Sequence, residues 1–167
     1  LAEPGDFVTH QLGRESILMV RQPDLSVKSF HNVCPHRGNR LVYSDSGSMD
    51  QFTCSYHGWQ YNLAGTLIHV QDGDDFPQGN PCGKLSLSEI PSEEWAGFVW
   101  YNMDENCCPL ASFLGEVTSY IDLHKLDQMK RVYYKVCEVD FNWKALHDNF
   151  CESYHLPSTH PQIGDYF

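Results

Sequence analysis

The sequence predicts an α+β fold, in which a small all-β domain is followed by the beginning of a second domain that mixes helix and strand. Residues 7–102 contain short apolar or alternating runs separated by clusters of Gly, Pro, Asn and Asp, a pattern typical of closely spaced strands. After residues 103–109 the pattern changes to one that favours longer elements. We therefore place the all-β domain at residues 1–106 and the start of the second domain at residues 107–167.

The second domain is expected to contain two helices and one long strand. Residues 109–124 favour a helix that begins at Pro109, because proline is well tolerated in the first turn. Residues 129–144 are rich in β-branched and aromatic side chains and predict a strand. Residues 144–156 predict a helix that ends near Pro157.

Charge and composition exclude several classes of function. The formal net charge of −11 argues against nucleic acids and anionic membrane surfaces, because both require clustered Lys and Arg. No run of about 18 apolar residues predicts a membrane span, and the first residues do not resemble a signal peptide. Seven cysteines at irregular spacing form a poor disulfide framework, so we expect a reducing, cytoplasmic location in which some cysteines bind metal.

Two short segments each place a cysteine close to a histidine. Cys34 and His36 are separated by one residue, and Cys54 and His57 are separated by two. Seventeen residues lie between the two pairs. Two thiolates and two imidazoles suit iron or zinc, so two loops can hold one metal centre from opposite sides.

The way in which cysteine and histidine are paired is compatible with zinc or iron but favours iron. Structural zinc sites usually take a pair of cysteines from one element and a pair of histidines from another. Here each loop supplies one of each, so one iron can take both sulfurs and a second iron both nitrogens. Gly38 and Gly58 follow the two pairs, where the backbone must turn sharply.

The two loops resemble the cluster-binding loops of the Rieske iron–sulfur family in their oxygenase form. The resemblance rests on "CPHRG" at residues 34–38 and "CSYHGWQYNLAGTL" at residues 54–67. It implies that Cys34 and Cys54 bind one iron of a [2Fe-2S] cluster and that His36 and His57 bind the other.

The chain departs from the respiratory branch of this family. Respiratory Rieske proteins carry an additional cysteine in each loop, and Asn39 and Tyr56 stand at the corresponding places here. The departure favours the ferredoxin or oxygenase branch. Trp59 and Tyr61 are expected to pack around the loop rather than to take part in chemistry.

A second group of metal-ligating residues lies near the end of the sequence. Glu152 and His155 are three residues apart and would share one face of a helix. His160 follows beyond Pro157, where a helix end would bring it back beside His155. Two histidines and a carboxylate form the facial triad of non-haem iron oxygenases.

Together the two groups resemble the α-subunit of Rieske non-haem iron oxygenases, whose catalytic domain is of the helix-grip type. The resemblance implies that His155 and His160 bind a mononuclear Fe(II) and that Glu152 bridges to a cluster histidine of a neighbouring subunit. It places Asn149 near the iron. The family's third ligand is an aspartate far downstream, and Asp165 matches no ligand position. We therefore expect this sequence to be a fragment.

The resemblance implies the terminal oxygenase of a multicomponent system. It would activate O2 with electrons from NAD(P)H, delivered by a reductase with or without a ferredoxin, and hydroxylate or dihydroxylate an aromatic substrate. The expected assembly is a homotrimer or an α3β3 complex. One alternative is an N- or O-demethylating monooxygenase, for example on a quaternary amine. Alternatives of other classes are a Rieske-type electron carrier and a zinc-stabilised binding module.

Overall fold

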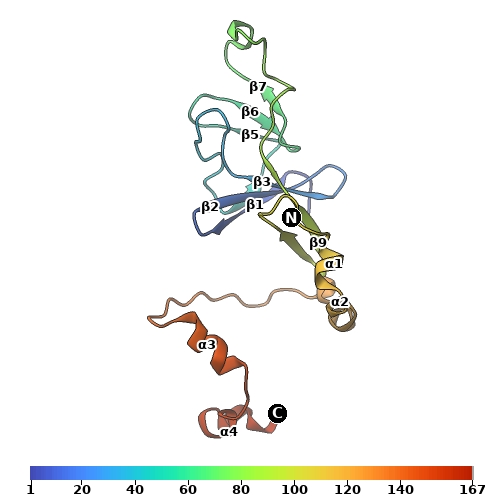
Figure 1. Cartoon of the computed structure of the whole chain (residues 1–167), viewed down its shortest axis with the longest axis vertical. Helices are drawn as coiled ribbons and strands as arrows, with labels where there is room; N and C mark the ends of the chain where they lie inside the picture. Colours follow the sequence, from blue (N-terminus) through green and yellow to red (C-terminus); the bar gives the residue numbers. More distant parts are fainter. Residues whose placement is uncertain (167) are drawn as a thin grey trace. The chain divides into compact units, whose positions relative to one another are not determined.

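The computed structural model describes residues 1–166, with side chains described as far as Ile163. The chain forms two compact units, the first spanning Leu1–Met129 and the second beginning at Lys130. Figure 1 shows that the strands belong to the first unit and that short helices dominate the second. The expected fold class, an all-β domain followed by helices, is confirmed. The expected boundary between residues 106 and 107 stays a prediction.

The first unit contains three small antiparallel sheets. Its strands are β1 (Asp6–Leu12), β2 (Glu15–Arg21), β3 (Val27–His31), β4 (Ser46–Ser48), β5 (Gln51–Thr53), β6 (Gln60–Asn62), β7 (Leu67–His69), β8 (Glu89–Ile90), β9 (Ser92–Trp95) and β10 (Phe98–Tyr101). The first sheet has the order β4-β1-β2-β3-β8, the second β5-β6-β7 and the third β10-β9. Short strands joined by tight turns agree with the turn-rich sequence.

The central strand β2 is buried on both faces. Successive side chains of a strand point to opposite sides, so Leu18 and Val20 face one way and Ile17 and Met19 the other. Leu18 and Val20 join the larger core, which the β5-β6-β7 sheet and the cysteine loops complete. Ile17 and Met19 form a smaller core with Ile90, against which the β9-β10 hairpin packs.

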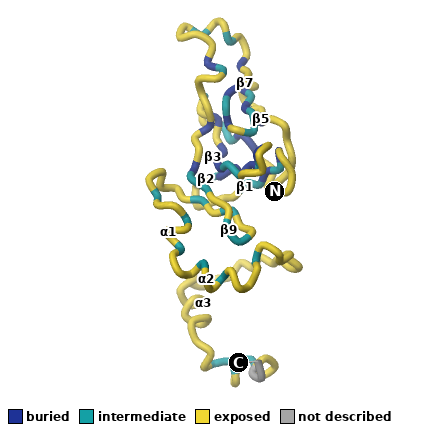
Figure 2. The backbone as a smooth tube through the Cα atoms, turned by 90° about the vertical axis from the view of Figure 1, so that its right-hand side faces the viewer, coloured by how far each residue is buried: buried dark blue, intermediate teal, exposed yellow. Residues whose placement is uncertain are grey.

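The larger core lies between the two main sheets and extends into the cysteine loops. Its buried members are Phe7, Leu18, Val20, Phe30, Cys34, Leu41, Val42, Phe52, Cys54, Trp59, Tyr61, Leu67, Val70 and Leu87. Figure 2 shows that the buried positions gather among the strands of this unit. Fully burying one large apolar side chain contributes about 1.5–3 kcal/mol, so this core holds both loops in place.

The helix expected over residues 109–124 is wrong as a single element. The structure has α1 (Leu110–Leu114) and α2 (Val117–Ile121), followed by the 3₁₀ helices η2 (Asp122–His124) and η3 (Leu126–Gln128). Gly115 ends α1 with a φ of 53°, a conformation that breaks the helical path and that glycine adopts without steric cost. A further 3₁₀ helix, η1 (Gly73–Asp75), lies in the loop after β7.

The strand expected over residues 129–144 is also wrong. Residues 130–142 form neither helix nor strand, and most of their side chains are exposed. A strand is defined by hydrogen bonds to a neighbour, and no described strand pairs with this segment. High β-propensity therefore produces no sheet here, because propensity depends on packing against a partner.

The last expected helix is interrupted. The second unit contains α3 (Trp143–Phe150), α4 (Leu156–Thr159) and the 3₁₀ helix η4 (Pro161–Tyr166). Asn142 caps α3 by accepting a hydrogen bond from the backbone N–H of Lys144 at 3.0 Å. Pro157 lies in the first turn of α4 rather than after a helix, a place where its missing N–H costs nothing. Within the described residues, no helix has the length and apolar character that a membrane crossing demands.

Candidate metal sites

The loop after β3 carries the first cysteine and histidine and is closed by two backbone hydrogen bonds. The N–H of Cys34 donates to the carbonyl of Asn39 at 2.8 Å, and the N–H of Gly38 donates to the carbonyl of Cys34 at 2.9 Å. Gly38 has a φ of 71°, which side-chain-bearing residues rarely adopt. The loop thereby turns the Cys34 sulfur into the core, where the residue is 1% exposed.

The loop between β5 and β6 repeats this backbone frame. The N–H of Cys54 donates to the carbonyl of Trp59 at 2.8 Å, and the N–H of Gly58 donates to the carbonyl of Cys54 at 2.9 Å. The offsets from the cysteine equal those of the first loop, and Gly58 has a φ of 68°. The two loops therefore fix their sulfurs alike, although the histidine stands two residues after one cysteine and three after the other.

The two thiols are both buried, and the pKa of each is shifted from its ordinary value. Burial raises the pKa of Cys34. Burial also acts to raise the pKa of Cys54, but hydrogen bonds to its sulfur, first those from the backbone N–H groups of Tyr56 and His57, act in the opposite direction, and the pKa is lowered. Donors aimed at a sulfur stabilise its thiolate form, which is the form that binds metal.

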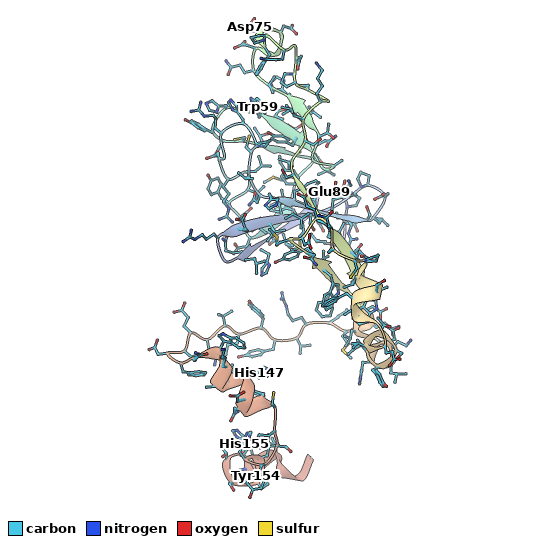
Figure 3. The ribbon with its side chains drawn as sticks, viewed as in Figure 1. Trp59, Asp75, Glu89, His147, Tyr154 and His155 are labelled. Carbon is cyan, nitrogen blue, oxygen red and sulfur yellow. The ribbon has the colours of Figure 1, made fainter. Side chains whose placement is uncertain are left out.

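The two imidazoles lie side by side, each against an aromatic ring. The ring centroids of His36 and His57 are 4.6 Å apart. His36 stacks on the indole of Trp59 at 4.5 Å, and His57 lies 3.9 Å from the ring of Tyr56. Figure 3 shows Trp59 beside the three-stranded sheet. Burial lowers the pKa of His36, which favours the neutral ring that a metal requires.

We call Cys34, His36, Cys54 and His57 the two-loop site. The Nδ1 atom of His36 is buried and finds no hydrogen-bond partner among the described residues. A buried polar atom without a partner is costly, so this nitrogen fits a metal ligand. No three Cys, His, Asp or Glu side chains in the described chain are grouped to hold one ion. Two thiols and two imidazoles divided between two irons fit a [2Fe-2S] cluster of the Rieske type.

Sequence reasoning missed the contribution of Tyr61 to this site. Its hydroxyl lies 3.1 Å from the Sγ atom of Cys34, and the side chain is fully buried. Because a thiolate sulfur can only accept, the hydroxyl would be the donor to a metal-bound Cys34. Burial raises the pKa of Tyr61 far above its ordinary value, so the donor keeps its proton. A buried tyrosine needs a partner for its hydroxyl, but the burial of Tyr61 beside Cys34 becomes visible only in the fold.

Glu152 and His155 lie between α3 and α4, and His160 lies at the end of α4; the three line one hollow, and we call them the late histidine site. Figure 3 labels His155. The ring centroids of the two histidines are 5.6 Å apart at 75°. The Oε1 atom of Glu152 hydrogen-bonds with Nδ1 of His155, and this bond is the first cause that lowers the pKa of Glu152. The expected shared helical face is wrong, because residues 151–155 form a turn that makes the contact instead.

The late histidine site borders an open hollow of about 540 Å³. Its lining residues are Asn149, Phe150, Cys151, Glu152, Ser153, His155, Leu156, His160 and Ile163. Asn149 comes from the last turn of α3 and therefore lies at the same hollow as both histidines. The carboxylate oxygen that orients His155 leaves the Nε2 atom of that ring for a metal, the usual arrangement of a ligating histidine. Asp165 lies outside the described side chains.

Fold and site together define a Rieske-type iron–sulfur protein with a second, histidine-based site. Residues 1–79 match the family of the Rieske [2Fe-2S] domain. Residues 126–165 match the catalytic domain of the ring hydroxylating alpha subunit. The chain matches both domains, and its homologues are Rieske oxygenase α-subunits, as its motifs predicted.

Curated relatives cover nearly the whole chain. The carnitine monooxygenase oxygenase subunit of Acinetobacter pittii is 34% identical over 170 residues, which are 99% of this chain and 45% of the relative. The benzene 1,2-dioxygenase subunit alpha of Pseudomonas putida is 36% identical over 168 residues, which are 95% of this chain and 36% of the relative. The chain therefore spans less than half the length of these relatives.

Solved structures show the same fold. A quaternary ammonium Rieske monooxygenase in complex with L-carnitine has a TM-score of 0.84 at 34% identity, and the match covers 100% of this chain and 48% of the other. Naphthalene 1,2-dioxygenase with indole bound in the active site has a TM-score of 0.76 at 32% identity, covering 98% and 38%. Both relatives are oxygenases, so the match extends across two substrate classes.

Proposed function

We propose that this chain carries the two iron-binding sites of a terminal oxygenase. Cys34, His36, Cys54 and His57 would hold a [2Fe-2S] cluster, and His155 and His160 would supply two ligands of a mononuclear iron. The cluster supplies single electrons when bound, and the mononuclear iron supplies O2 activation. The observation that carries the proposal is that one chain contains both sites. The two-loop site has buried sulfurs and a His36 nitrogen without a hydrogen-bond partner, and the late histidine site has His155 beside His160.

The residues around each site prepare it for this chemistry. The two sulfurs are buried, and His36 stacks on Trp59, so the side chains of the two-loop site are held in place by packing. Glu152 fixes the tautomer and orientation of His155 by accepting a hydrogen bond from its Nδ1 atom. The same carboxylate has a second oxygen, which accepts from the backbone N–H of His155 at 3.2 Å. In the assembled enzyme we expect Glu152 to bridge to a cluster histidine of a neighbouring subunit.

For the natural polypeptide that carries this sequence we propose hydroxylation or dihydroxylation of an aromatic ring. Relatives named for benzene 1,2-dioxygenase activity support this substrate class. Electrons would come from NAD(P)H through a reductase, with or without a ferredoxin. A homotrimer or an α3β3 complex would bring sites of neighbouring subunits together, in a catalytic domain of helix-grip type that begins after residue 106.

A second candidate is oxidative N-demethylation of a quaternary amine. The observation that favours it is the match to a quaternary ammonium monooxygenase with bound carnitine, which has a TM-score of 0.84. The two candidates differ in product, since demethylation releases formaldehyde and ring hydroxylation does not. Assaying the natural polypeptide with an aromatic hydrocarbon and with carnitine therefore distinguishes them.

Metal content and spectroscopy test the proposal against an electron carrier and a zinc-binding module. We expect a red-brown protein with three irons per chain in the natural polypeptide, two in the cluster and one at the late histidine site. Two irons indicate a carrier, and a colourless zinc protein contradicts the proposal. His57→Ala should abolish the cluster signal in electron paramagnetic resonance, and an unchanged signal would remove His57 from the ligand set.

The bridging role of Glu152 has its own test. Glu152→Ala should keep the cluster spectrum and most of the bound iron but lose oxygenation, because electron transfer between subunits requires the bridge. Glu152→Gln keeps the size and one acceptor, so it should retain more activity than the alanine variant. Turnover in Glu152→Ala at the level of the unmodified enzyme would disprove the bridge.

A further inference from the structure

Asn39 joins the two cluster-binding loops through its side chain. Its Nδ2 atom lies 3.3 Å from Oγ of Ser55 and 3.8 Å from Sγ of Cys54, both in the second loop. The same nitrogen donates to the carbonyl of Arg40 at 2.9 Å, and its Oδ1 atom accepts from the hydroxyl of Tyr43 at 3.4 Å. The contacts at both ends hold the amide in one orientation, with its N–H groups toward the second loop.

The contacts of the two sulfurs are reciprocal across the loops. Tyr61 follows the second loop on β6, and its hydroxyl reaches the sulfur of Cys34 in the first. Asn39 belongs to the first loop, and its amide reaches the sulfur of Cys54 in the second. Each cysteine therefore has one side-chain donor that its own loop does not supply.

We propose that Asn39 is a positioning residue that ties the loops together and raises the reduction potential of the cluster by donating to the Cys54 sulfur. Hydrogen bonds to cluster sulfurs stabilise the reduced form, which carries one more negative charge, so each donor shifts the potential upward. The backbone of Asn39 also serves the first loop, since its carbonyl accepts from the N–H of Cys34. The side chain of Asn39 contacts the second loop, whereas its backbone contacts only the first loop. Substituting the side chain therefore tests the link between the loops and leaves the backbone hydrogen bond in place.

The inference rests on the proposed cluster, and it is tested by redox titration of the natural polypeptide with its cluster bound. Asn39→Leu keeps the size of the side chain but removes both N–H donors, so we expect a lower midpoint potential and a retained cluster signal. Asn39→Asp keeps the acceptor for Tyr43 and places a carboxylate near the sulfur, so its potential should fall further. Both variants should also lose the visible cluster absorption sooner than the unmodified chain.

Ser55→Ala should not lower the midpoint potential, unlike the two Asn39 variants. The two hydrogens of the Asn39 amide face three acceptors, and removing the Ser55 hydroxyl frees a donor for Cys54. Its potential should therefore equal or exceed that of the unmodified chain. Asn80→Ala, which removes an asparagine outside both loops, should leave the potential unchanged and serves as the matched control.

The outcomes separate this inference from the proposed function. An unmodified chain that assembles no cluster overturns the proposed function. A loaded chain whose potential is the same in Asn39→Leu overturns the inference, even if the variant loses its cluster faster. If Asn39→Leu assembles no cluster, Ser55→Ala and Asn39→Asp decide, and a lower potential in Ser55→Ala or an unchanged one in Asn39→Asp overturns it.

Discussion

The hydroxyl of Tyr61 lies 3.1 Å from the sulfur of Cys34. Both residues belong to the core and are almost fully buried. The relationship joins a strand position to a proposed metal ligand that stands 27 residues earlier in the chain. It gives the buried hydroxyl its partner and the sulfur a donor. A side chain that packs the core therefore also affects the electronic properties of the site.

Tyr61→Phe should lower the midpoint potential of the cluster while the cluster remains bound. The change removes one oxygen and leaves the ring, so packing is kept and only the hydrogen bond to sulfur is lost. Redox titration followed by electron paramagnetic resonance measures the shift. Tyr101→Phe removes a hydroxyl that bonds with His10 outside the loops, and it should have no effect. Equal potentials in the Tyr61 variant and the unmodified chain would contradict the prediction.

Gly58→Ala should reduce the free energy of unfolding of the loaded chain by about 1–2 kcal/mol, the cost of left-handed backbone for a residue with a Cβ. An added Cβ at Gly58 meets no atom within 4 Å, so the cost comes from the backbone alone. Denaturant unfolding measures it. Gly58→Asn should cost less, because asparagine enters this region more readily. An alanine variant as stable as the unmodified chain would show that the loop does not require a positive φ.

Phe30→Ala should cost about 3–5 kcal/mol, because it leaves a cavity in the larger core. Phe30 is 1% exposed and belongs to the same buried cluster as Cys34 and Cys54. Phe113→Ala removes a ring that is 74% exposed and should change stability by less than about 0.5 kcal/mol. Denaturant unfolding of the 167-residue chain compares the two, and similar losses would place Phe30 outside the core.

Asp6 should make stability depend on pH in acid. The backbone N–H groups of Glu3 and Ala2 donate to its carboxylate at 3.0 and 2.9 Å, and they hold its pKa below the ordinary value. The unfolded chain therefore binds the proton more readily, so the stabilisation is present above about pH 4 and disappears as the pH falls through the folded pKa.

Asp6→Asn tests this, since the amide imitates the protonated carboxyl group. The variant should be less stable than the unmodified chain near neutral pH, and the difference should shrink as the pH drops below about 4. Thermal unfolding across that range measures it. A difference that stays constant with pH would show that the carboxylate charge is not what stabilises this turn.

The sequence predicted the two loops and the residue types that we propose as their ligands. Cys34 and His36 are two residues apart, and Cys54 and His57 are three residues apart. Each loop is closed by backbone hydrogen bonds between residues four or five positions apart. Short-range patterns of this kind are visible without a fold. The turn-rich strands of the first unit could be predicted for the same reason.

Long-range contacts were decided only by tertiary structure. The bond from Tyr61 to Cys34 and that from Asn39 to Cys54 join residues far apart in the chain, and no local pattern announces them. The segment 130–142 has the composition of a strand, but a strand also requires a partner, which composition does not supply. Glu152 contacts His155 as its spacing suggested, yet through a turn rather than a helix, because Phe150 ends α3 first. Residue types and local spacing are thus written in the sequence, whereas the approach of distant side chains depends on how the core packs.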